Sequence, residues 1–576
     1  MDRNYFFERN LLSLSAHNPA LCSQLSVTET TKGRYKFLNA RTGELIPALS
    51  DSSGCAHPLH STVDPVREAR RLVSTLQDEN GRISDGFIVF LGLGGGFAPE
   101  LLLGNSEISH VLVIEYDING IAELLCSREY ITLLGDSRFT LLIDPAAAVI
   151  ESTILDLYRP ALAGGIRTLL LRARVDLDKH NFTAASEAIQ HALEKVSSDY
   201  SVQAYFGKRW FTNIIRNLNI AEQQNRSAAP IREAAICAAG PSLDDQISRL
   251  IEHREHSSGL FIISADTALP ALLQQGIRPD AVVSIDCQHI SYYHFMGVLC
   301  KSIPLFLDIA SPPLLAGFSD LPFFFSGGHP LAAYISQEWR PLPLLDTSGG
   351  NVSYACLSLA ENLGARHITV YGADFSYPGG RVYARGSYIY PYFERRQERR
   401  TPLESLLSEF LFRAPFLPSD QEETAHKKPI PYETATMRMY RRRFEQKASA
   451  IDAQVTIVEG KGMPVNLGSR PVTRQSDSRN RVFNLFAPGK ILMHAERFLE
   501  QYSHAISALP PINKTINANT WLRNLDTSQK RIFITLLPQA ATLKRCQSEF
   551  STAELIEAVK RVSIEEIDRV LAGNMG

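Results

Sequence analysis

Residues 233–286 contain three apolar runs, which read EAAICAAGPS (233–242), LFIISAD (260–266) and AVVSID (281–286). Each run ends in a polar or glycine-containing turn, and the segments between the runs have the apolar spacing of helices. Alternating strands and helices predict a parallel sheet with crossover helices. Because ligands of such sheets bind beyond the carboxyl ends of the strands, we expect the three turns to share one edge and to form the functional site.

The overall composition narrows the class of protein. With 576 residues, of which 44% are hydrophobic and 21% charged, the chain predicts a globular protein of several domains. A net charge of -2 gives no general attraction to nucleic acid. Eight cysteines are scattered without a C-x-x-C pair, which is typical of reduced thiols. With no apolar run long enough for a membrane span and no signal-peptide core, the chain predicts a cytoplasmic protein.

A second strand pattern begins at Gly86. An apolar strand at 87–91 is followed by a glycine turn at 92–96, and the next strand, at 111–114, ends in Glu115. A glycine turn lets backbone approach a ligand, and an acid at the end of the next strand can bind ribose hydroxyls. The arrangement resembles the Rossmann domain of S-adenosylmethionine-dependent methyltransferases and polyamine synthases. The alternative is that the glycines only allow tight packing in a domain whose pocket is empty.

A third stretch offers a phosphate site. Thr347, Ser348 and Gly349 precede a helix predicted over 352–363, and small residues at a helix start present free N–H groups that suit a phosphate. Farther on, residues 383–400 are rich in tyrosine and arginine and include Arg385 and Tyr388, which suit an anionic sugar or phosphate. The alternative for the later arginines is a solvated helix face.

Four short motifs carry a family resemblance: AGPSL (239–243), DAVVSID (280–286), TSG (347–349) and GADF (372–375). The region from about 230 to 460 resembles the Maf (motility-associated factor) flagellin glycosyltransferases, which share this domain with archaeal 6-hydroxymethylpterin diphosphokinases. It is more distantly similar to the family 42 sialyltransferases. The implied fold is an α/β protein with a central Rossmann-like (GT-A or sialyltransferase-like) parallel sheet over 229–470. We expect a mixed segment over 1–80 and a second Rossmann-like domain over 81–228 before it, and a helical domain over 471–576 after it.

The resemblance also implies roles for individual residues. The residues that match the nucleotide-binding motifs would be Gly240, Ser242, Ser348 and Gly349. We expect Pro241, Asp266, Asp286 and Thr347 to bind the nucleotide with them. The tyrosines that stabilise the departing phosphate would be Tyr377 and Tyr383, with Arg385 and Tyr388 contacting sugar or acceptor. Phenol hydroxyls and helix-end N–H groups can stabilise that charge without a covalent intermediate.

The sequence departs from the sialyltransferase pattern in two ways. Ala239, Asp266 and Asp286 stand where those enzymes carry asparagine, so the two aspartates either hold Mg²⁺ or bind ribose directly. No cofactor is otherwise required. The position of the sialyltransferase general base is occupied by Ile430. The remaining candidates for a catalytic base are His426, His329 and Asp374.

The leading hypothesis is transfer of a nonulosonic acid, such as pseudaminic or legionaminic acid, from a CMP-activated donor to Ser or Thr hydroxyls of flagellin. Flagellin would be the protein partner, and motility would depend on the reaction. One alternative is an Mg²⁺-dependent pyrophosphokinase that acts on a pterin alcohol. The other is a non-enzymatic scaffold for a partner protein.

Overall fold

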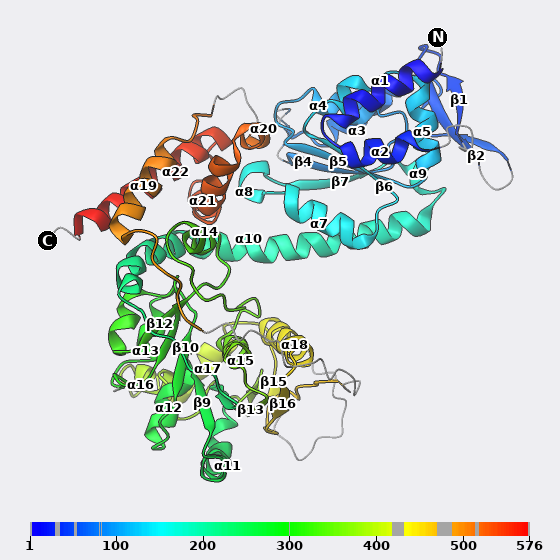
Figure 1. Cartoon of the computed structure of the whole chain (residues 1–576). Helices are drawn as coiled ribbons and strands as arrows, with labels where there is room; N and C mark the ends of the chain where they lie inside the picture. The colour runs from blue at the N-terminus through cyan, green and yellow to red at the C-terminus, as the bar shows by residue number, and fades with distance from the viewer. Residues whose placement is uncertain are drawn as a thin grey trace, which may run out of the picture. The chain divides into compact units, whose positions relative to one another are not determined.

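The computed structural model describes residues 3–28, 35–50, 54–79, 81, 83, 85–298, 300–416, 431–468, 486–512 and 518–573. The chain forms two compact units, shown in Figure 1. Unit 1 comprises Met1–Gly207 and Ile506–Val562, and unit 2 comprises Lys208–Ala505 and Ser563–Gly576. Each unit contains its own parallel sheet.

Unit 2 contains a seven-stranded sheet in the order β12-β11-β10-β9-β8-β13-β16, in which every neighbouring pair is parallel. Its strands are β8 (Glu233–Cys237), β9 (Leu260–Ala265), β10 (Ala281–Ser284), β11 (Leu305–Asp308), β12 (Pro322–Phe325), β13 (His367–Tyr371) and β16 (Gln454–Ile457). The three runs at 233–286 thus form adjacent parallel strands, and the predicted α/β fold with a central parallel sheet is confirmed. The chain builds outward from β8 in one direction as far as β12 and then returns to its other side with β13.

Helices cross between these strands. The longer ones are α11 (Leu243–His256), α14 (Pro330–Glu338), α15 (Val352–Asn362), α17 (Leu403–Phe412) and α18 (Ala435–Ala450). Helix α19 (Ala495–Ser507) follows the last strand. Short ones follow β9 and β10 and precede α17, namely α12 (Leu269–Gln274), α13 (Ile290–Tyr293) and α16 (Ile389–Glu394). Helix α15 packs against β8, β9 and β10, and its buried face joins Ile236, Ile263 and Val283 in one apolar core. Apolar residues on both faces of the strands explain why the sequence runs are continuous rather than alternating.

Unit 1 contains a four-stranded parallel sheet in the order β6-β5-β4-β7. Its strands are β4 (Phe87–Leu91), β5 (His110–Glu115), β6 (Phe139–Ile143) and β7 (Ile166–Leu170). An antiparallel sheet of β1 (Tyr35–Asn39), β2 (Leu45–Ser50) and β3 (Ala56–Pro58) precedes it. The helices α20 (Ala518–Asn524) and α21 (Thr527–Cys546) come from the far end of the chain, and α22 (Thr552–Gly573) continues into the residues of unit 2.

This division differs from the four segments expected from the sequence. The boundary between the units falls between Gly207 and Lys208, within α10 (Lys179–Glu222), which is one continuous helix of 44 residues. The C-terminal helices form no unit of their own, since Ile506–Val562 belongs to unit 1 with the first sheet. Among the described residues, none of the helices combines the length and apolar character that a membrane crossing requires.

Candidate functional site

The carboxyl edge of the seven-stranded sheet gathers polar side chains from six strands. They are Ser242 after β8, Asp266 after β9, Asp286 after β10, Asp308 at the end of β11, Ser326 after β12 and Asp374 after β13. Because all neighbouring strands are parallel, these positions lie at one edge. The predicted turns at 240–242, Asp266 and Asp286 therefore do share that edge.

Ser242 and Asp374 are bonded to each other at this edge. The Asp374 carboxylate accepts hydrogen bonds from the Ser242 N–H (2.8 Å), the Ser242 hydroxyl (2.5 Å) and the Gly462 N–H (3.2 Å). The same hydroxyl accepts a bond from the Lys461 N–H at 2.7 Å. Burial raises the pKa of Asp374, although these bonds oppose the effect. We call this group of residues, Ser242, Asp374 and 460–462, the latch, because it joins the loops that follow β8, β13 and β16.

The latch is closed to a ligand. Cβ atoms built on Gly240, Gly460 and Gly462 would lie 2.5, 3.0 and 2.5 Å from side-chain atoms of Asp374, so only glycine fits these positions. Both functional groups of Ser242 and both oxygens of Asp374 are already bonded within the fold. The geometry therefore favours the alternative that Asp374 fixes the loops, and it leaves the Ser242 hydroxyl no proton to donate to a nucleotide.

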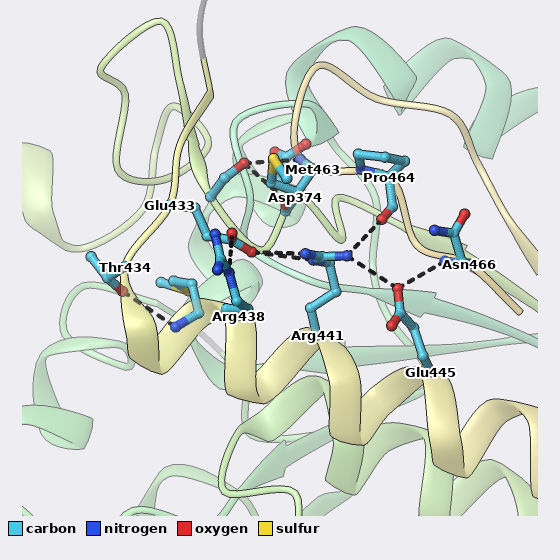
Figure 2. Close-up of polar contacts among 11 residues, drawn as sticks. Asp374, Glu433, Thr434, Arg438, Arg441, Glu445, Met463, Pro464 and Asn466 are labelled. Atoms are coloured by element: carbon cyan, nitrogen blue, oxygen red, sulfur yellow. Dashed lines mark hydrogen bonds and ion pairs between the residues drawn. The ribbon is translucent and has the colours of Figure 1, made fainter. Parts of the chain in front are cut away.

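The start of α18 is fixed by a second network, shown in Figure 2. The buried carboxylate of Glu433 accepts from Arg438 Nε at 2.8 Å and from the Arg441 guanidinium at 3.0 Å. Arg441 also reaches Glu445 and the Pro464 carbonyl, which ties α18 to the segment after β16 (Figure 2). These two cations of the basic helix are thus paired within the fold.

The turn at Thr347, Ser348 and Gly349 leads into α15. The Ser348 N–H and hydroxyl both bond Asp346, at 3.0 and 2.7 Å, while Asn351 caps the helix by accepting from the Tyr354 N–H. Ser348 itself is exposed, and its carbonyl accepts from Arg443 at 3.0 Å. A phosphate at this turn would have to share the Ser348 N–H with Asp346, so the role of the turn stays a prediction.

Two tyrosines, Tyr383 and Tyr388, lie near Asp266, with Tyr377 and Arg413 near Tyr383. The rings of Tyr383 and Tyr388 are 6.1 Å apart, and Tyr383 is near enough to Tyr377, Arg413 and Asp266 for their charges to affect its ionisation. Burial raises the pKa of Tyr388 to about 12 and that of Tyr383 further, so both phenols stay protonated at neutral pH. Arg413, at the end of α17, was not among the residues predicted from the sequence. The cluster offers hydroxyl donors and one cation to an anion.

Asp266 is buried and fully engaged. Its Oδ1 accepts from the Thr267 N–H at 2.7 Å, and its Oδ2 accepts from the Ser284 hydroxyl at 2.7 Å and lies 3.3 Å from His294 Nδ1. Burial alone would raise the pKa of Asp266, but His294 and these hydrogen bonds lower it below its ordinary value. His294 is a second residue that the sequence analysis missed, although the stretch HISYYH (289–294) directly after Asp286 was a usable signal.

The expected Mg²⁺ site is not supported by these contacts. Both oxygens of Asp266 are occupied by protein donors, and Asp286 accepts from the Gln288 N–H at 2.9 Å. Burial, with help from the charge of Asp266, raises the pKa of Asp286, which disfavours the ionised form that a cation needs. Within the described ranges, no group of three or more His, Cys, Asp or Glu side chains could hold a metal ion.

The other candidates for a base are placed less well. His329 caps α14 through Nδ1, its Nε2 is buried without a partner, and burial lowers the pKa of the ring to about 3. Such a ring is a weak base. His426 lies in 417–430, outside the described residues. Arg385 is exposed, and its backbone N–H donates to Asp244 at 2.9 Å.

In unit 1 the glycine turn is filled by the chain's own side chains. The Gly95 N–H donates to His60 Nε2 at 2.8 Å, and a Cβ on Gly94 would lie 2.4 Å from the same nitrogen. Glu115 accepts from the Leu93 N–H at 2.8 Å and pairs with Arg174 at 2.8 Å, with both side chains fully buried. These contacts favour the alternative in which the glycines serve packing.

Comparisons with known proteins agree with the architecture. Residues 208–380 match the family described as 6-hydroxymethylpterin diphosphokinase MptE-like. Uncharacterized proteins of Treponema pallidum (strain Nichols) are 40% identical over 123 residues, covering 21% of this chain and 42% of the relative, and 37% identical over 110 residues, covering 19% and 51%. The matches thus span about half or less of the length of these curated relatives.

A solved structure matches the whole chain. The Maf glycosyltransferase from Magnetospirillum magneticum AMB-1 superposes with a TM-score of 0.60 at 14% sequence identity, over 99% of this chain and 96% of that one. The resemblance first seen in four short motifs is therefore confirmed in the fold of almost every part of the molecule. The protein has a Maf-like fold, with an MptE-like domain over residues 208–380.

Proposed function

We propose that this protein is a glycosyltransferase that moves a nonulosonic acid from a CMP-activated donor to Ser or Thr hydroxyls of flagellin. The observation that carries the proposal is the Maf fold over nearly the whole chain, together with the tyrosine cluster beside Asp266 at the carboxyl edge. The acceptor would be a protein, and the flanking parts of the chain would have the role of docking it.

The chemistry of the donor fits the cluster. When the bond from the sugar to phosphate breaks, negative charge develops on the departing CMP, and hydrogen-bond donors placed there stabilise the transition state. Tyr383 and Tyr388 remain protonated because burial raises the pKa of each phenol, so each hydroxyl can donate. Arg413 adds a positive charge near both rings.

Calorimetric titration tests the proposal. We expect the wild-type protein to bind CMP and CMP-activated sugar, and Tyr383→Phe to lower kcat about 10²-fold while donor affinity stays the same. Tyr292→Phe is the matched control, because this tyrosine is exposed and belongs to the same unit.

Ser348→Trp should block the donor without unfolding the protein, since Ser348 is exposed. Unchanged donor binding in that variant would refute the placement of the nucleotide.

The MptE-like match supports one competing function, pyrophosphate transfer from ATP to a pterin alcohol. That reaction requires Mg²⁺ bound with the nucleotide, and the engaged oxygens of Asp266 argue against a preformed metal site. In the same titration, Mg²⁺-dependent ATP binding without CMP binding would favour the kinase. Absence of any nucleotide binding would favour a scaffold.

A further inference from the structure

His294 lies directly after α13 and faces the end of β9. Its Nδ1 is 3.3 Å from Asp266 Oδ2, although the ring does not point at this oxygen as directly as the Ser284 hydroxyl does. Catalytic hydrogen bonds are often long or poorly aligned before substrate binds. Asp266 cannot turn away, because Thr267 and Ser284 hold its two oxygens.

The other nitrogen of the ring is available. Within the part of the chain that the structure describes, His294 Nε2 makes no hydrogen bond, and it is not among the buried atoms, so it reaches the surface. The ring packs on Tyr388 at 4.7 Å, and 9% of the side chain is exposed. The ionisable groups around it are Asp266, Asp286 and the Tyr388 phenol.

Two other histidines of the same unit show how a structural histidine looks here. His253 uses both nitrogens, bonding the Tyr371 hydroxyl at 2.9 Å and Glu233 at 3.0 Å. His329 caps a helix with one nitrogen and buries the other. In His294 one nitrogen faces a buried carboxylate and the other faces outward, beside the residues that we expect to bind the donor. A carboxylate behind an imidazole orients the ring and stabilises its charged form.

We propose that His294 is the general base of the transfer and that Asp266 is its positioning residue; this rests on the proposed function. Nε2 takes the proton of the acceptor hydroxyl as the hydroxyl oxygen bonds to the anomeric carbon of the sugar. The bond from that carbon to the phosphate oxygen breaks, and CMP leaves with the electron pair. The proton stays on His294, whose charge Asp266 balances, until solvent removes it.

The test compares His294→Gln with His289→Gln, in which an exposed histidine five residues earlier is changed. With CMP–pseudaminic acid as donor and flagellin as acceptor, His294→Gln should lower kcat about 10²- to 10³-fold, while the Kd for CMP changes less than threefold. His289→Gln should match the wild type. A His294→Gln variant that keeps more than a third of the wild-type kcat would overturn the inference.

Chemical rescue separates a base from a merely structural ring. Imidazole added to His294→Ala should restore part of the rate, and should fail in the double variant that also carries Asp266→Asn. Rescue of both variants to the same extent would overturn the role of Asp266. If the wild-type protein itself binds no CMP, the proposed function fails and this inference with it. If the wild type transfers sugar and His294 is dispensable, only this inference fails.

Discussion

The two parallel sheets of this protein have the same local plan and different surroundings. In each, an apolar strand leads into a glycine-containing turn, and the next strand ends in a fully buried acid, Glu115 in unit 1 and Asp266 in unit 2. Glu115 pairs with Arg174, which is as deeply buried as the acid. Asp266 instead lies 3.3 Å from Nδ1 of His294, whose side chain is 9% exposed. The two edges therefore share the strand and turn pattern and differ in the partner of the buried acid.

The largest expected effect concerns the buried pair of Glu115 and Arg174 in unit 1. Arg174→Met leaves the Glu115 carboxylate buried without its cation, which should lower the free energy of unfolding of unit 1 by about 3 to 5 kcal/mol. Urea denaturation followed by circular dichroism measures the loss. The double variant Glu115→Gln with Arg174→Met should recover much of it. His294→Gln should lower the free energy of unfolding by less than about 1 kcal/mol. An equal loss of stability in Arg174→Met and His294→Gln would contradict the comparison of the two sheets.

A second test concerns Asp308, another acid at the edge of unit 2, whose Oδ1 accepts from the Ala310 N–H. Burial raises its pKa to about 7 in the folded state, whereas the unfolded chain has a pKa of about 4. Between these values the unfolded state loses its proton and the folded state keeps it, so stability falls as the pH rises from 4 to 7. As the pH rises from 5 to 8, this acid should lower the free energy of unfolding by about 2 to 3 kcal/mol.

Asp308→Asn should therefore be less sensitive to pH than the wild type. Thermal unfolding at pH 5 and pH 8 measures the difference, and the gap between the two values should shrink in the variant. The same pH dependence in both proteins would mean that Asp308 is ionised in the folded state and therefore differs from our description.

The smallest effect tests the latch. Asp374→Asn places an amide N–H₂ beside the Ser242 and Gly462 donors and should lower stability by about 1 to 2 kcal/mol. Lys461→Ala is the control, because its side chain forms only an exposed pair with Asp245 and should change stability by less than about 0.5 kcal/mol. Loss of transfer in Asp374→Asn without loss of stability would instead return Asp374 to the list of catalytic residues.

The sequence predicted what local patterns can determine. Runs such as LFIISAD identify strands, and parallel pairing then places Asp266 and Asp286 at one edge. Local patterns do not contain the partners that arrive from elsewhere in the chain. Arg174 reaches Glu115 from 59 positions away, so the glycine turn alone could not reveal that its site was filled.

The same limit applies at the candidate site. Asp374 and Ser242 looked like a catalytic acid and a nucleotide contact, because neither the sequence motif nor its spacing reveals that 132 positions of chain bring them into a hydrogen bond. Arg413 and His294 were missed because short loops after α17 and α13 carry them to the tyrosines. The family motifs predicted which loops meet at the carboxyl edge of the sheet. Contacts between distant parts of the chain determine which polar side chains at that edge are already hydrogen-bonded.

The crowding around Asp374 has a consequence for mutagenesis. Gly240, Gly372, Gly460 and Gly462 lie in this corner, each with a backbone or side-chain atom within 2.6 Å of where a Cβ would stand. A saturation screen of this protein would therefore report four intolerant positions in a tight cluster at the mouth of the sheet. That cluster would look like an active site on a tolerance map, yet its cause would be steric.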